Sequence, residues 1–131
     1  MIVVDTSVWI DFFRATSGQD RERLEELILD SNRVAICGII LQEILQGIKS
    51  RKVYETTRER LLKFPFLNAN RETYLLAASI YRELRSHGIT VPSTDVTIAA
   101  ICVSNRAPIF TRDEHFVEIG KHSRLVIYSR K

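Results

Sequence analysis

Four acidic residues stand where a predicted strand ends or where the helix after it begins. Asp5 directly follows an apolar run at the start of the chain, and Asp113 closely follows the apolar run in "PIFTRD". Glu43 lies in the early turns of the helix after the second predicted strand, and Asp95 opens an apolar helix after "VPST". The carboxyl ends of parallel strands share one edge of a sheet, so the four acids are predicted to converge there.

Converging carboxylates restrict the chemistry that such a site can support. Like charges raise one another's pKa values, and the cluster is unstable unless a cation compensates. Ligand sets made only of oxygen suit Mg²⁺ or Mn²⁺ rather than zinc. An ion held in this way can activate a water molecule and stabilise phosphate oxygens during an in-line displacement. The acids therefore favour a metal-assisted reaction on a phosphate group.

Each acid also has a purely structural explanation. Asp5, Asp95 and Asp113 are placed where aspartate often only caps a helix or forms a turn. Glu43 lies among apolar residues, where an unpaired carboxylate is costly, although its neighbour Gln42 is consistent with a solvated helix face. The joint occurrence of four such acids is what favours the metal site.

Other reaction types have little support in the sequence. His87, His115 and His122 lack the close spacing that zinc-binding helices use, and we interpret them as surface or helix-capping residues. The chain has no G-x-S-x-G motif and no glycine-rich phosphate loop, and it holds 5 glycines in all. We therefore do not expect a nucleophilic serine or a backbone phosphate cradle.

The elements that must position the acids alternate along the chain. Apolar runs predict strands at residues 2–4, 33–37, 66–69, 108–110 and 125–128. Amphipathic or apolar periodicity predicts helices at 7–14, 21–29, 40–48, 53–64, 71–87, 95–104 and 115–120, with loops at 16–20 and 89–95. This alternation predicts an α/β fold, a three-layer α/β/α sandwich with a central, mainly parallel sheet, in one domain over residues 1–131.

Composition is that of an ordinary globular chain. Of 131 residues, 45% are hydrophobic and 27% charged, and 19 Lys and Arg against 16 Asp and Glu give a net charge of +3. That small excess permits a nucleic-acid partner without requiring one. Cys37 and Cys102 lie in apolar runs and are predicted to be buried thiols rather than a disulfide. No run is long enough for a membrane span and no secretory signal is evident, so we expect a cytoplasmic protein.

Four segments together resemble one known family. "VVDTSVWI", "LQEILQGI", "PSTDVTIAA" and "IFTRDEHF" are similar, in order and spacing, to motifs of the PIN-domain family, and most of all to the VapC toxins of bacterial type II toxin–antitoxin pairs. The resemblance covers essentially the whole chain. It implies a Mg²⁺- or Mn²⁺-dependent endoribonuclease whose acids are Asp5, Glu43, Asp95 and Asp113, none of which departs from the family pattern.

The same resemblance implies supporting residues. Ser7 matches the small polar residue two positions after the first acid, and Thr111 matches the Thr of a T-x-D pattern. Both would position a carboxylate or the metal's water. Among the basic residues available around the site, Arg112 is the candidate phosphate contact. Glu114 and Asp11 match no family position and are left out of the core set.

Partners are implied as well: an RNA substrate, a cognate antitoxin and a second copy of the chain in a homodimer. The candidate groove for the antitoxin is formed by apolar residues of the first helices, each of which is equally consistent with ordinary core: Val8, Trp9, Phe12, Phe13, Leu24, Leu27 and Ile28. Two alternatives remain open. One is a non-catalytic PIN-like domain that binds RNA or regulates, and the other is a phosphodiesterase that acts on DNA or a flap.

Overall fold

The computed structural model describes residues 1–14, 18–30 and 33–129. These residues form a four-stranded sheet in the order β3-β2-β1-β4, with every pair parallel. The strands are β1 (Ile2–Val4), β2 (Val34–Cys37), β3 (Phe66–Leu67) and β4 (Ile109–Phe110). All residues of β1, β2 and β4 are buried, as expected for a parallel sheet that helices cover on both faces.

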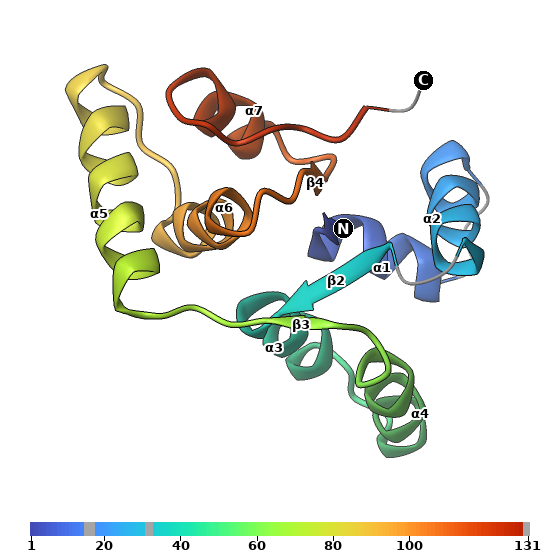
Figure 1. Ribbon diagram of the computed structural model, residues 1–131. Helices are drawn as coiled ribbons and strands as arrows, with labels where there is room; N and C mark the ends of the chain where they lie inside the picture. The colour runs from blue at the N-terminus through green and yellow to red at the C-terminus, as the bar shows by residue number, and fades with distance from the viewer. Residues whose placement is uncertain (15–17, 31–32, 130–131) are drawn as a thin grey trace.

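Helices cover the sheet in two groups (Figure 1). The described residues form α1 (Thr6–Phe13), α2 (Gln19–Leu29), α3 (Gly38–Gln46), α4 (Arg51–Leu61), α5 (Arg71–Ser86), α6 (Ser93–Ser104) and α7 (Glu114–Lys121). Helices α1 to α4 contact one another on one side of the sheet, and α5, α6 and α7 do so on the other. The predicted α/β/α sandwich is confirmed.

Strand order creates a crevice between β1 and β4. From β1 the chain moves outward to β2 and β3, then returns across the sheet to place β4 on the other side of β1. In open α/β sheets, ligands bind at such a reversal, outside the carboxyl ends of the strands. Asp5 follows β1 and Asp113 follows β4, so two of the four acids flank this crevice.

Local signals define several helix ends. Asn70 and Thr73 form a capping box at the start of α5, and Gly88 adopts a φ of +74° just beyond its end, as its position there predicts. Cys37 and Cys102 are buried and free, which confirms the prediction for both thiols. None of the described helices combines the length and the apolar character that crossing a membrane requires.

Three sequence predictions are corrected. The strand predicted at 125–128 is a single parallel bridge between Ile109 and Ile127, because β4 itself has only two residues to pair with. The loop predicted at 89–95 ends sooner, since α6 begins at Ser93. The loop predicted at 16–20 lies partly outside the described residues, and its last two residues already belong to α2.

Candidate active site

Asp5 follows the central strand, and its side chain does not cap the helix that it precedes. The residue occupies the N-cap position of α1, yet its carboxylate makes no capping hydrogen bond there. Instead its Oδ2 accepts hydrogen bonds from the hydroxyls of Ser7 at 3.1 Å and Thr111 at 2.9 Å. Asp5 is only 6% exposed. The capping explanation considered for this acid is therefore wrong, and two hydroxyls instead orient a buried carboxylate.

Thr111 connects Asp5 to Asp113. The Thr111 hydroxyl donates to Asp5 and accepts a hydrogen bond from the Asp113 backbone N–H at 3.0 Å. The Asp113 carboxylate caps α7 by accepting from the backbone N–H of His115 at 2.9 Å. The capping explanation therefore holds for Asp113, but 38% of its side chain stays exposed to solvent. The same carboxylate therefore caps α7 and remains partly accessible.

Asp95 lies in the first turn of α6, where the positive end of the helix dipole favours its ionised form. Its Oδ2 accepts a hydrogen bond from His115 Nδ1 at 3.0 Å, and that nitrogen is also 3.4 Å from Oδ1 of Asp113. One ligand atom from each of Asp95, Asp113 and His115 lies within 4.8 Å of the other two. The structure therefore brings the third and fourth predicted acids together.

Glu43 is tied to the site through the helix that Asp5 precedes. It belongs to α3 and is partly exposed, and its Oε1 accepts a hydrogen bond from the Thr6 hydroxyl at 2.9 Å. Its charge acts on the Cys37 thiol, as does that of Asp5, and burial is the main cause that raises the pKa of this thiol. Glu43 therefore lies on the β1–β2 side of the cluster, whereas Asp95 and Asp113 lie on the β4 side.

The acids share an unfavourable electrostatic environment. Burial is the largest cause that raises the pKa of Asp5, and the charge of Asp113 raises it further, against the lowering effect of the Thr111 and Ser7 hydrogen bonds. Burial likewise raises the pKa of Asp95, and the charges of Asp113 and Asp5 add to the effect. Three acids from distant parts of the chain thus repel one another across one crevice.

This donor set fits a hard divalent cation. A cation between the carboxylates would compensate the repulsion that raises the pKa values of Asp5 and Asp95. The carboxylate oxygens are ligands that Mg²⁺ and Mn²⁺ prefer, and the single nitrogen in the group belongs to His115. Asp95 and Asp113, which with His115 form the group within 4.8 Å, could hold the ion. Asp5 and Glu43 lie outside that group, and Asp5 is linked to Asp113 through the Thr111 hydroxyl.

Two residues of this site were missed by the sequence analysis. His115 was interpreted as a surface or capping histidine, yet it contacts two of the acids. His87 and His122 do occupy the C-cap positions of α5 and α7, so the interpretation holds for those two. Thr6 was not considered, and it orients Glu43. The one available signal was the position of His115 two residues after a predicted acid.

Arg112 is engaged by acids outside the cluster. Its guanidinium forms an ion pair with Asp11 of α1 and lies 3.6 Å from a carboxylate oxygen of Asp20 in α2. The side chain remains 52% exposed. A phosphate could therefore reach Arg112 only by sharing or replacing these carboxylates, and its role as a phosphate contact stays a prediction.

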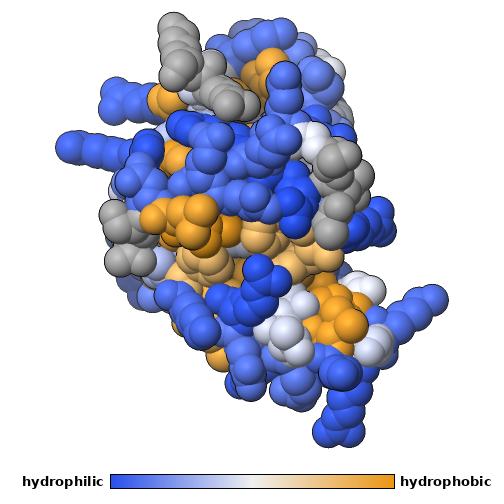
Figure 2. Space-filling view, turned by 90° about the vertical axis from the view of Figure 1, so that its right-hand side faces the viewer, coloured by the Kyte–Doolittle hydropathy of each residue, from blue (hydrophilic) through white to orange (hydrophobic). Residues whose placement is uncertain are grey.

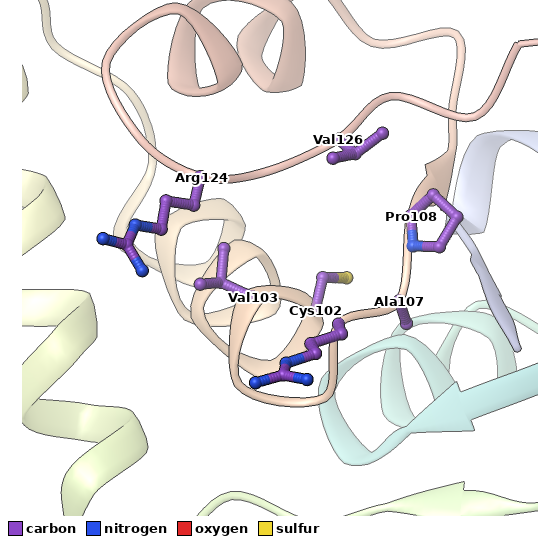
Figure 3. A pocket seen from close by; sticks show the side chains of 7 residues that line it. Cys102, Val103, Ala107, Pro108, Arg124 and Val126 are labelled. Atoms are coloured by element: carbon purple, nitrogen blue, oxygen red, sulfur yellow. The ribbon is translucent and has the colours of Figure 1, made fainter.

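A hollow of about 460 Å³ lies at the opposite, amino-end side of β4 (Figure 3). Its lining consists of Cys102, Val103, Arg106, Ala107, Pro108, Arg124 and Val126. None of the four acids contributes to it. The acidic cluster therefore lies outside this hollow.

Comparison with known proteins gives a family match over most of the chain. The family model described as PIN domain matches residues 2–122. "Ribonuclease VapC11" of Mycobacterium tuberculosis is 37% identical over 129 residues, which cover 95% of this chain and 96% of that protein. "Ribonuclease VapC1" of Methanocaldococcus jannaschii is 30% identical over 129 residues, which cover 98% and 88%.

Solved structures share the fold. VapBC2 from Rickettsia felis, bound to a DNA fragment from its promoter, matches with a TM-score of 0.81 at 18% identity, covering 100% of both chains. DNA-bound VapBC from Salmonella typhimurium matches with a TM-score of 0.79 at 22% identity, covering 98% of both chains. At these identities the likeness supports the α/β/α architecture alone.

Proposed function

The chain belongs to the PIN-domain family, and from that membership we propose that it is an endoribonuclease dependent on Mg²⁺ or Mn²⁺. The observation that carries the proposal is the orientation of Asp5. A buried carboxylate at an N-cap position makes no capping hydrogen bond and is held instead by the hydroxyls of Ser7 and Thr111, where the charge of Asp113 acts on it. Burying a charge in this way is costly unless a ligand compensates it, and a divalent cation is that ligand.

The four acids are proposed as the catalytic residues. Asp5, Asp95 and Asp113 hold the cation, and Glu43 completes the set from α3. When bound, the cation lowers the pKa of a water molecule and polarises a phosphate oxygen. Ser7 and Thr111 fix the side chain of Asp5 by donating to the same carboxylate oxygen, so that its orientation does not depend on the ion.

RNA is proposed as the substrate because relatives at 30% and 37% identity are named ribonucleases. A cluster of acids attracts a polyanion only after a cation reverses its local charge. Basic residues around the crevice then contribute to binding. Arg112 is the proposed phosphate contact, and a phosphate oxygen would share or replace its ion pair with Asp11.

An antitoxin is proposed as the protein partner, bound at the face of α1, α2 and α4. Figure 2 shows an apolar band between hydrophilic regions on this face. Four of the seven groove candidates, Val8, Trp9, Leu24 and Leu27, are core residues with at most 1% exposure. The other three line a hollow of about 280 Å³: Phe12, Phe13 and Ile28, together with Trp9, Arg60, Lys63 and Phe64.

Contacts of Arg60 on this face indicate what a partner would need. Trp9 Nε1 and Arg21 Nε are buried beneath it and find no acceptor among the residues that the structure describes. Arg60 lies over the rings of both Phe12 and Phe13, at 5.4 and 5.1 Å. A partner segment with apolar side chains and exposed carbonyl or carboxylate oxygens would suit this surface.

A homodimer is proposed separately, through the exposed Tyr74 and Leu75 of α5.

An RNA cleavage assay tests the catalytic proposal. Purified protein is incubated with RNA in Mg²⁺, Mn²⁺ or EDTA, beside the Asp5→Asn variant. We expect cleavage only with the metal, and a loss of at least about 100-fold in the variant, because the change removes a charged ligand at the reacting centre. Asp30→Asn, the same chemical change at an exposed helix end, is the matched control and should cleave like the parent.

The other outcomes separate the alternatives. Cleavage that persists in EDTA or in Asp5→Asn would contradict the proposal. Tight, salt-dependent RNA binding without cleavage would favour the non-catalytic domain. Equal cleavage of a DNA strand of the same sequence would favour the broader phosphodiesterase.

A further inference from the structure

His115 lies between two acids that come from different elements. Its ring Nδ1 is 3.0 Å from Oδ2 of Asp95 in α6 and 3.4 Å from Oδ1 of Asp113, the N-cap of α7. Ionised carboxylates only accept hydrogen bonds, so the hydrogen is on Nδ1, which donates to Asp95. The backbone N–H of the same residue donates to Asp113 at 2.9 Å. A single residue thus contacts both acids.

These contacts act against the electrostatic repulsion between the carboxylates of Asp95 and Asp113. Asp95 and Asp113 repel each other, and only 14% of the Asp95 side chain is exposed to water that could screen its charge. The hydrogen bond from His115 lowers the pKa of Asp95, against the opposing effects of burial and of neighbouring charges. Among the residues that the structure describes, His115 is the one whose side chain lies within 4.0 Å of the carboxylates of both Asp95 and Asp113.

We propose that His115 is a positioning residue for the metal centre, whose ring holds Asp95 and Asp113 side by side so that a divalent cation meets a preformed pair. The inference rests on the proposed metal site and adds a residue outside the four acids. Groups that orient metal ligands through hydrogen bonds typically change metal affinity by about 10- to 100-fold when they are removed.

Position and contacts distinguish His115 from the other two histidines. His87 and His122 end their helices, and their rings contact each other with centroids 4.3 Å apart. His115 instead lies in the first turn of α7, two residues after the capping acid, where the helix start fixes its backbone. A hard cation prefers oxygen ligands, and Nδ1, the nitrogen within 3.0 Å of Asp95 and 3.4 Å of Asp113, is already hydrogen-bonded to Asp95, so we assign the ring a supporting role.

Mn²⁺ titration by calorimetry tests the proposal without RNA. We expect His115→Ala to bind Mn²⁺ about 10- to 100-fold more weakly than the parent. His115→Asn should stay within about threefold of the parent, because the amide N–H of asparagine can donate near the place of Nδ1. His122→Ala is the matched control and should bind like the parent. Thermal unfolding in EDTA checks that each variant is folded.

Several results would overturn the proposal. Unchanged affinity in His115→Ala would remove the positioning role, and equal weakening in His115→Asn would show that ring volume matters rather than the donor. A nitrogen coupling to bound Mn²⁺ in the electron paramagnetic resonance spectrum, absent in His115→Ala, would make the ring a direct ligand. Failure of the parent to bind Mn²⁺ would remove the metal site itself, and with it the metal-dependent mechanism proposed above.

Discussion

The two ends of β4 place different demands on the chain. At the carboxyl end, the acids are well held by hydroxyls and a helix cap, but their charges repel and burial raises the pKa of Asp5 and Asp95. At the amino end, the charges of Arg106 and Arg124 are exposed to solvent, but Arg106 has a φ of +52°. The carboxyl end thus has favourable local geometry and unfavourable electrostatics, and the amino end has the reverse.

This difference supports the carboxyl end of β4 as the proposed ligand site. Backbone strain at a helix end costs about 1–2 kcal/mol, and this strain provides no group that a ligand could bind. Crowded, desolvated carboxylates repel one another, and a bound cation reduces that repulsion. The free energy released in this way contributes to the affinity for the cation. We therefore expect substitutions at the carboxyl end to change catalysis and metal-linked stability, and substitutions at the amino end to change stability alone.

The largest expected effect is on catalysis. Asp95→Asn keeps the size and the position of the side chain but removes one charge, and we expect RNA cleavage to fall by at least about 100-fold. Arg124→Gln, at the opposite end of β4, should leave the cleavage rate within about twofold of the parent. Single-turnover cleavage with saturating enzyme measures both. A comparable loss in Arg124→Gln would remove the functional difference between the two ends.

A smaller effect is expected on stability as a function of pH. A carboxyl group whose pKa is raised on folding binds its proton more tightly in the folded state. The contribution of Asp5 to the free energy of unfolding without metal therefore falls as pH rises from about 4 to its raised pKa, and that contribution is constant above this value. Asp5→Asn lacks this loss, so its stability relative to the parent should increase with pH over the same interval.

Urea unfolding in EDTA at several pH values measures this difference. Saturating Mg²⁺ should reverse it at neutral pH, adding about 2.7 kcal/mol to the parent at 100 times the dissociation constant and much less to the variant. Parallel pH profiles for the parent and Asp5→Asn would show that burial of this carboxylate has no electrostatic cost.

The smallest effect is expected from Arg106→Gly. Arg106 occupies the position after α6 where the Ala107 N–H bonds back to the Cys102 carbonyl, a helix end that favours glycine. Relief of the left-handed strain, less the entropy that glycine adds to the unfolded chain, should raise the free energy of unfolding by about 0.5–1 kcal/mol. Metal affinity and RNA cleavage should not change. Destabilisation would mean that the Arg106 side chain contributes contacts that outweigh the strain.

Most of the fold was predictable because its signals are local. Apolar runs marked β1, β2 and β4, and periodicity marked all seven described helices to within a few residues. The last strand was overestimated because the length of a parallel strand depends on its partner, and β4 offers only two residues. The start of α6 was placed late because Pro92 serves as its N-cap, where "VPST" had suggested a loop.

The candidate site was predictable in part. That Asp5 and Asp113 would flank one crevice followed from strand parallelism, and Asp95 contacts the same cluster through His115. Whether Asp5 capped a helix or faced other acids was undecided, because both roles place aspartate after a strand. The deciding contact joins Asp5 to Thr111, which lies 106 residues away in the sequence.

The sequence by itself determined the order of strands and helices along the chain. The parallel strands that this order predicts place the acids at one edge of the sheet. Hydrophobic periodicity and helix caps act over a few residues, so they can be recognised without a structure. Only the tertiary structure decided the contacts of individual side chains: His115 on Asp95 and Asp113, Arg112 on Asp11, and the two hydroxyls on Asp5. Most of these contacts join residues from separate elements, whose relative placement depends on packing of the whole sheet and its helices.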